Sequence, residues 1–393
     1  MTSTRHSPKQ PSPSPPSRSR ARPGSVGLTR TERVVLFSGD EPLLLDSGVR
    51  LAPVEVAYET YGTLNQTASN AVFVCHALTG DAHAAGHHGN PQRTGWWDTL
   101  IGPGKPLDTD RYHIICANLL GGCQGTTGPS TLNPADGRPY GLRFPHFTVA
   151  DLVKAHRALL SHLGIQRLAA AIGGSLGGMQ VLQWALDHPQ DLDAAILVCA
   201  SPRLSAQNIA FSAVARASIM RDEHFNGGDY YTTPHRPDVG LAVARMLAHI
   251  TYTSEHSLEQ KFGRRHTNGS PTHDLETDFE VERYLDHQGS SFLNRFDANT
   301  YLYLSRVMDY YDPFADEHAA RQQLRRSTTR FLLVSFDTDW RFNTNHSLQI
   351  ARMLASAGVP VAHREITSPH GHDSFLLPIP TYHHAIHDFL ATT

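Results

Sequence analysis

Three residue types that act together in acyl transfer occur in this chain in a set order: a serine, an aspartate and a histidine. Ser175 lies in GGSLG (173–177), which has the spacing G-x-S-x-G. Between a strand and a helix, this motif can hold a serine hydroxyl on a sharp turn, and the glycines permit the close approach of the chain. The alternative interpretation is a tight structural turn with an incidental serine. Because a serine hydroxyl is a weak nucleophile, the functional interpretation needs a base and an acid elsewhere in the chain.

Where a serine lies on such a turn, the acid comes first along the chain and the histidine second, and both partners follow in that order here. Asp339 comes after the apolar run FLLVSF, and His372 comes after the run VAHREI. Asp337 and His370 compete for the same two roles. We favour Asp339, because Asp337 is closer to the strand end and is expected to cap the loop. We favour His372, because the preceding glycine lets its ring turn towards Ser175.

Acyl transfer through a serine also requires donors for the developing oxyanion. The backbone N–H of Leu176 is one expected donor. The loop CHALTGD (75–81) should supply the other, and we assign it to Leu78. The following tract HAAGHH (83–88) has three histidines but no acid at a convincing spacing. We therefore expect local hydrogen bonding there, and neither a metal nor another cofactor.

The elements that must position these residues alternate between strand and helix patterns, which predicts a doubly wound α/β fold with a mostly parallel eight-stranded sheet. Helical patterns cover 148–164, 179–188 and 382–392. The expected strands are 34–37, 54–62, 71–77, 112–118, 168–174, 194–200, 331–336 and 361–366.

The alternation stops in the second half of the chain, and this sets the predicted domain boundaries. Residues 203–310 read as helices joined by loops, which is typical of a cap inserted over one end of a sheet. The α/β core is then formed by 31–202 and 311–393. Residues 1–30 form a basic tail rich in Pro, Ser and Arg, which we expect to be disordered because it cannot bury enough apolar surface.

Composition excludes several classes of function. The chain has 393 residues, a formal net charge of −3 and 40% hydrophobic residues, so there is no general field for nucleic acid or an acidic membrane. No apolar run approaches the roughly 20 residues that a membrane span needs. The four cysteines lack C-x-x-C spacing, which favours free thiols in a reducing cytoplasm.

Taken together, these motifs resemble the homoserine O-acyltransferases of the α/β-hydrolase fold, which open the branch to methionine. The resemblance covers about residue 34 to the C-terminus. Its most specific stretches are NAVFVCHALTGDAHAAG, GWWDTLIGPGKPLDTDRYHIICANLLGGCQGTTGPSTLNP, AAIGGSLGGMQVLQWA, SPRLSAQNIAF, GLAVARMLAHITY, KFGRR, RFDANTYLYLSRVMDYYD and GHDSFLLP.

The resemblance implies that Ser175, Asp339 and His372 are a catalytic triad in a ping-pong reaction. Acyl-CoA, a co-substrate, would acylate the serine, and L-homoserine would take the acyl group. Arg245 would bind the α-carboxylate of homoserine, and Asp373 would bind its α-ammonium. Without the resemblance, we would interpret Arg245 as an arginine on a helix surface. Relatives are cytoplasmic homodimers built through the helical insertion.

The family that this chain resembles has members that use acetyl-CoA and members that use succinyl-CoA. One residue of this chain bears on the choice between the two donors. Arginine two positions after the triad aspartate is typical of succinyl-transferring relatives, whereas acetyl-transferring ones have an apolar residue there. Here that residue is Arg341, whose guanidinium could bind the distal carboxylate of succinyl-CoA. It could also pair with Asp337 or Asp339, or contact a CoA phosphate. The loop GGCQGTTGPS (121–130) and much of the insertion are more similar to acetyl-transferring relatives. We expect succinyl-CoA to be preferred.

Four alternatives stay open at this point. One is a homoserine O-acetyltransferase, and another is a serine O-acyltransferase, whose acceptor is one methylene shorter. A third is a carboxylesterase, in which water takes the acyl group. The last is a binding protein without activity, which the complete serine, aspartate and histidine set argues against.

Overall fold

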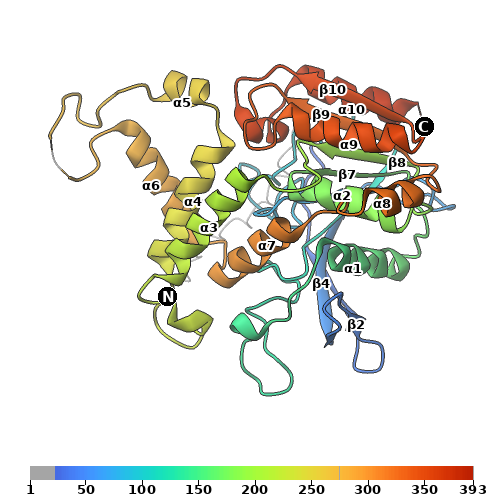
Figure 1. Ribbon diagram of the computed structural model, residues 1–393, viewed down its shortest axis with the longest axis horizontal. Coiled ribbons are helices and arrows are strands. Elements are labelled where there is room, and N and C mark those ends of the chain that lie inside the picture. The colour runs from blue at the N-terminus through green and yellow to red at the C-terminus, as the bar shows by residue number, and fades with distance from the viewer. Residues whose placement is uncertain (1–22, 274, 393) are drawn as a thin grey trace, which may run out of the picture.

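The computed structural model describes residues 23–273 and 275–392, and a single eight-stranded sheet organises them (Figure 1). The strand order is β1-β4-β6-β5-β7-β8-β9-β10. The strands from β6 to β10 are parallel, while β1 and β4 are antiparallel to their neighbours. Their bounds are β1 Glu32–Phe37, β4 Val54–Tyr61, β5 Ala71–Cys75, β6 His113–Ala117, β7 Ala170–Gly174, β8 Ala194–Val198, β9 Arg330–Phe336 and β10 Val361–Ile366.

This sheet is the predicted fold class, and each predicted strand is present within two residues of its expected bounds. The central strands are buried on both faces, which explains their almost continuous apolar sequences. One small element was not expected, a two-stranded hairpin of β2 (Leu43–Leu44) and β3 (Arg50–Leu51).

Helices cover both faces of the sheet. On one face pack α1 (Val149–His162), α2 (Leu176–Asp187), α8 (Glu317–Leu324) and α9 (Thr344–Ser356), whose apolar residues share one buried cluster. On the other face α10 (Pro380–Ala391) joins a second cluster with the loop that carries Trp97 and Leu100. Helix α2 begins three residues before its predicted start, directly after Ser175, and α8 and α9 were not predicted.

The segment between β8 and α8 is mostly helical, and its helices α3 to α6 project to one side of the sheet (Figure 1). In it, α3 packs on α4, and α4 packs on α6. The end of α4 also approaches the 3-10 helix η3 (Gly371–Leu376), which follows β10. The bounds are α3 Ala206–Met220, α4 Asp238–Tyr252, α5 Glu255–Lys261, α6 Glu280–Leu293 and α7 Ala298–Tyr310.

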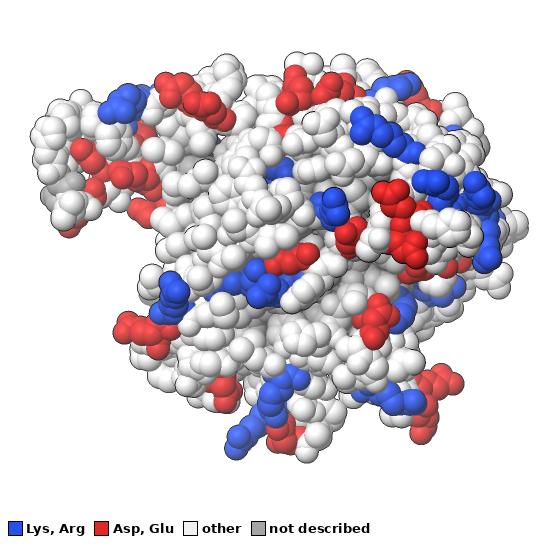
Figure 2. Space-filling model, viewed as in Figure 1, with Lys and Arg blue, Asp and Glu red and all other residues white. Residues whose placement is uncertain are grey.

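Charge on the molecular surface is mixed. Lys and Arg lie interspersed with Asp and Glu across the face seen in Figure 2. Within residues 23–273 and 275–392, every helix falls short of the length and apolarity that a membrane span requires. Cys75, Cys116, Cys123 and Cys199 are all free thiols. Residues 1–22 of the predicted tail lie outside the described residues. Residues 23–30 are described, and backbone hydrogen bonds of 3.0 Å join Thr29 and Gly27 to His87, which the expectation of a disordered tail up to residue 30 did not anticipate.

Candidate active site

Ser175 occupies a strained turn between β7 and α2. Its φ is 59° and its ψ is −123°, a conformation that a residue with a Cβ adopts only when its surroundings impose it. A Cβ on Gly173 would lie 2.3 Å from the carbonyl carbon of Gly177, and one on Gly177 would lie 2.0 Å from the Cys75 carbonyl oxygen. Only glycine therefore fits at these two positions, and the motif is a requirement of the turn.

Asp339 and His372 form a buried pair at the same edge of the sheet. Asp339 is 1% exposed and His372 is 3% exposed. The Nδ1–H of His372 donates to Asp339 Oδ2 over 2.7 Å. The other carboxylate oxygen, Oδ1, accepts from the backbone N–H groups of Arg341 (3.0 Å) and Phe342 (2.8 Å). These bonds fix the carboxylate and leave the second ring nitrogen of His372, Nε2, free to act as a base.

The two competing residues have other partners. Asp337 Oδ1 accepts from the backbone N–H of Ser368 over 2.9 Å, so Asp337 ties the loop after β10 to the loop after β9. His370 Nδ1 lies 3.2 Å from the Ser257 hydroxyl of α5. Both residues therefore hold the loop that carries His372.

A cavity of about 420 Å³ brings the candidate residues together. Ser175, His372 and Leu78 line it, as do Arg245 and Asp373. Its volume lies within the usual range for small-molecule sites, about 300–1,000 Å³. Leu176 is the first residue of α2, so its backbone N–H belongs to the unpaired amides at the positive end of that helix.

The loop of Leu78 is held from beneath by a buried histidine. His76 Nε2 accepts from the backbone N–H of Leu119 over 3.2 Å, and its Nδ1 lies 2.8 Å from the Ala77 carbonyl. Burial lowers the pKa of His76. The ring is therefore a neutral support for the loop.

Arg245 contributes a cationic group to the cavity and Asp373 a carboxyl group, and Arg295 and Asp81 also line it. The guanidinium of Arg245 lies 4.7 Å from the centre of the Phe292 ring, and its Nε is buried without a hydrogen-bond partner among the described residues. Burial raises the pKa of Asp373 to about 6, although nearby His372 and Arg245 act to lower it. A guanidinium and a carboxyl group in one cavity match the two ends of an α-amino acid.

Arg341 lies behind the cavity wall. It is 7% exposed and is not among the lining residues. Its Nη1 donates to Thr251 Oγ1 over 2.7 Å, and its guanidinium lies 5.3 Å from the ring centre of Tyr252, which does line the cavity. Its Nε is buried without a partner, and no carboxylate of the described chain lies within 4 Å of the guanidinium. The side chain forms no ion pair with Asp337 or Asp339 within that distance.

Two further lining residues were missed in the sequence analysis. Arg295 Nη1 donates to the Thr79 carbonyl over 2.9 Å, next to Leu78, and its guanidinium lies on the Phe292 ring like that of Arg245. His249 contacts the Tyr284 hydroxyl over 3.1 Å, and burial together with Arg245 lowers its pKa to about 3. Arg295 is the first residue of RFDANTYLYLSRVMDYYD, a stretch that the sequence analysis singled out. Nothing in that stretch indicated that its side chain lines the cavity.

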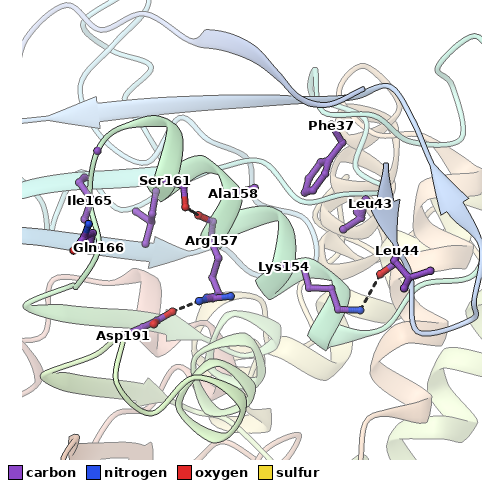
Figure 3. A pocket seen from close by; sticks show the side chains of 12 residues that line it. Phe37, Leu43, Leu44, Lys154, Arg157, Ala158, Ser161, Ile165, Gln166 and Asp191 are labelled. Carbon is purple, nitrogen blue, oxygen red and sulfur yellow. Dashed lines mark hydrogen bonds and ion pairs between the residues drawn. The ribbon is translucent and has the colours of Figure 1, made fainter. Parts of the chain in front are cut away.

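A larger cavity, of about 800 Å³, lies far from this chemistry. It is lined by α1 and the β1–β2 segment (Figure 3). Its charged groups already have partners: Arg157 Nε donates to Asp191 over 2.7 Å, and Lys154 donates to the Leu44 carbonyl over 3.0 Å (Figure 3). It has no nucleophile with a base, so we do not assign the reaction to it.

Known proteins resemble this chain in both sequence and fold. Residues 70–377 match the profile of a family described as alpha/beta hydrolase fold. A homoserine O-succinyltransferase of Magnetococcus marinus is 55% identical over 94% of this chain and 96% of its own length. Another, of Nocardioides sp., is 57% identical over 93% and 99%. A homoserine O-acetyltransferase of Rhodospirillum rubrum is 52% identical over 89% and 90%.

Solved structures agree in fold. The homoserine O-acetyltransferase of Bacillus anthracis superposes with a TM-score of 0.84 at 28% identity, covering 92% of this chain and 98% of that one. Esterase E22 superposes with a TM-score of 0.83 at 28% identity, covering 92% and 100%. Proteins with transferase and with esterase names therefore share this architecture.

Proposed function

This chain belongs to the homoserine O-acyltransferase family of the α/β-hydrolase fold, and from that premise we propose that it transfers a succinyl group from succinyl-CoA to the hydroxyl of L-homoserine. Ser175, Asp339 and His372 are the proposed catalytic triad. The proposal that succinyl-CoA is the acyl donor rests on Arg341. This buried arginine lies beside the triad and has no carboxylate partner in the described chain.

The first half-reaction forms an acyl-serine. His372 Nε2 accepts the proton of Ser175 as the hydroxyl oxygen attacks the thioester carbonyl, and Asp339 stabilises the imidazolium. The N–H groups of Leu176 and Leu78 stabilise the oxyanion of the tetrahedral intermediate. Its collapse breaks the C–S bond, and the proton on His372 passes to the departing thiolate of CoA.

The second half-reaction repeats these steps with homoserine as the nucleophile. His372 takes the proton of the homoserine hydroxyl, whose oxygen attacks the acyl-serine, and Ser175 regains its proton on leaving. Arg245 binds the α-carboxylate bidentately and Asp373 pairs with the α-ammonium. The helical segment over the cavity restricts water, which protects the acyl-serine from hydrolysis.

Arg341 supports a succinyl donor through an electrostatic argument. An ionised guanidinium without an anion is costly to bury. A carboxylate on the distal end of the acyl group would supply that anion, whereas an acetyl group would not. Because the guanidinium lies behind Tyr252, we infer that the Tyr252 ring moves aside when the succinyl group binds.

We expect Arg341→Leu to lower kcat/KM for succinyl-CoA by about 10- to 100-fold, the effect of losing one hydrogen bond to a charged group. The value for acetyl-CoA should change by less than about threefold, because acetyl has no carboxylate to lose. Steady-state assays with each donor at saturating homoserine measure both values.

Two variants control for the substitution itself. Arg352→Leu makes the same exchange at an exposed arginine of α9 and should leave both donors unchanged. Arg341→Lys keeps the charge without the planar fork and should give an intermediate loss. Equal succinyl-CoA kcat/KM in wild type and Arg341→Leu would refute the proposed donor.

The raised pKa of Asp373 predicts a pH dependence confined to the homoserine half-reaction. Its carboxyl group is ionised above about pH 6 and protonated below it. The attraction for the α-ammonium is therefore present above pH 6 and lost as the pH falls through 6. We expect kcat/KM for homoserine to approach a tenfold fall per pH unit below that value.

The acyl-CoA half-reaction is the internal control for this pH dependence, because Asp373 contacts neither the thioester nor CoA in the proposed mechanism. The rate of acyl-enzyme formation without homoserine should lack the acidic limb of the pH profile, which is the fall below about pH 6 that Asp373 causes. Asp373→Asn should raise the KM for homoserine at pH 8 and remove that limb. If the limb survives in Asp373→Asn, the assignment of Asp373 is wrong.

We also propose that the protein is a cytoplasmic homodimer that associates through the helical segment. The support is an exposed apolar stripe on α4 formed by Val239, Val243 and Ile250, which are 73%, 42% and 41% exposed. We expect Val243→Glu to shift sedimentation towards a monomer. An exposed valine outside the segment, Val35 of β1, provides the matched control Val35→Glu. Wild-type protein that sediments as a monomer would contradict the proposal.

Hydrolysis is the second candidate function, because esterase E22 has the same architecture. A matrix of donors and acceptors separates the two. Succinyl-CoA and acetyl-CoA are each incubated with homoserine, with serine or with no acceptor. A transferase consumes thioester rapidly only with homoserine, whereas rapid loss without any acceptor would favour an esterase.

A further inference from the structure

We propose that Glu59, His83 and His88 form a binding site for a divalent transition-metal ion such as Zn²⁺. The three residues supply two imidazoles and one carboxylate, a set that binds Zn²⁺ and Fe²⁺ in other proteins. The histidines belong to the tract HAAGHH, for which the sequence offered no acid. Strand β4 provides that acid, 24 residues before His83.

The geometry of these side chains suits one ion. Oε2 of Glu59 lies 3.1 Å from Nδ1 of His83, and Oε1 lies 2.7 Å from Nε2 of His88. One ligand atom from each residue falls within 4.8 Å of the others. Two ligands on a tetrahedral Zn²⁺ are roughly 3.3 Å apart, given bonds of about 2.0–2.1 Å. The two Glu59–histidine distances are therefore a few tenths of an ångström shorter than around a bound ion, and the third ligand pair, which lies within 4.8 Å, would adjust with them.

Electrostatics favours a cation at this position. The Glu59 side chain is fully buried, and within the described chain no Lys or Arg pairs with it. Its carboxylate accepts hydrogen bonds from Tyr61 (3.0 Å) and Thr31 (2.7 Å), which can orient a ligating carboxylate from outside. A divalent ion would place a full compensating charge beside this buried carboxylate, whose partners are hydroxyl groups and imidazoles.

The site has an entry path and borders the active-site cavity. The side chain of His88 is 45% exposed, so an ion can reach it from solvent. His83 lines the cavity that contains Ser175. A bound ion would tie residues 83–88 to β4 and so stiffen one wall of the cavity. It takes no part in the acyl-transfer steps, which the serine and histidine carry.

The test is metal binding by the full-length protein, free of a polyhistidine tag and stripped with a chelator. Co²⁺ is titrated while visible absorption is recorded, and Zn²⁺ is then added to displace it. We expect one ion per chain, with the absorption of a low-coordinate Co²⁺ site. Zn²⁺ should also raise the Tm of the stripped protein.

Variants separate this site from unspecific binding by histidines. His88→Ala removes a half-exposed ligand, so it should fold, and it should weaken Co²⁺ binding at least 100-fold. Glu59→Gln should do the same if it folds. His87→Ala, the matched control, removes the neighbouring histidine, whose ring lies outside the cluster, and should bind like wild type. Absence of one-to-one binding in wild type, or equal affinity in His88→Ala and His87→Ala, would overturn the proposal and leave a hydrogen-bond network only.

Discussion

Replacing Ser175 by alanine is expected to lower kcat for acyl transfer by about 10⁶-fold, the scale of loss found when the serine nucleophile is removed from a triad. The acyl group would have no oxygen to which it can be transferred. Mass spectrometry of the protein mixed with succinyl-CoA should show an added succinyl group on wild type and none on Ser175→Ala. The variant should still bind substrates, because Arg245 and Asp373 are intact.

The control for this experiment is Ser201→Ala, which removes the hydroxyl of a buried serine just after β8 while leaving the turn of Ser175 in place. It should be acylated like wild type. A Ser175→Ala protein that retained more than about one hundredth of wild-type activity would show that the acyl group does not pass through this serine. Circular dichroism would confirm that the variant is folded.

Replacing Asp339 by asparagine is expected to lower kcat by about 10⁴-fold, as the same change does in a serine protease triad. The amide would still accept from the N–H groups of Arg341 and Phe342. Its NH₂ group, however, would face His372 Nδ1 and favour the imidazole with its proton on Nε2. That tautomer cannot take the proton of Ser175. The rate of acyl-enzyme formation, followed as release of CoA thiol, measures this step directly.

Asp337→Asn is the matched control, because Asp337 lies two residues away and its carboxylate accepts a hydrogen bond only from the backbone N–H of Ser368 among the described residues. Its amide oxygen can still accept that bond, so we expect activity within about threefold of wild type. A large loss in Asp337→Asn with a small loss in Asp339→Asn would reverse our choice of the acid.

The sequence could predict the strands and the turn at Ser175 because their causes are local. A strand buried on both faces must be apolar along its length, and the close contact of Gly177 with Cys75 admits no side chain. The order of acid and histidine along the chain left Asp337 or Asp339 and His370 or His372 as candidates. The nearness of Asp337 to the strand end and the glycine before His372 favoured Asp339 and His372, which the structure joins by a hydrogen bond. Their catalytic roles stay predictions until the variants are assayed.

Residues that meet only through the tertiary fold could not be predicted in the same way. Glu59 reaches the histidine tract from a strand that no local pattern connects to it. Arg295 reaches the Thr79 carbonyl across 216 positions of the chain. The position of Arg341 behind Tyr252 depends on how the end of α4 packs against the loop after β9, and that packing has no signature in either segment alone.

The loops that carry Asp339 and His372 are both bonded to the helical segment. Trp340 Nε1 donates to the Thr253 carbonyl over 3.0 Å, and the Ser254 hydroxyl donates to the Pro369 carbonyl. A Cβ on Gly371 would lie 2.7 Å from the backbone nitrogen of Ser254. The segment therefore cannot evolve as an independent module: a chimaera that receives it from a distant relative must also receive the two loops, or it will fold with its acid and base out of register.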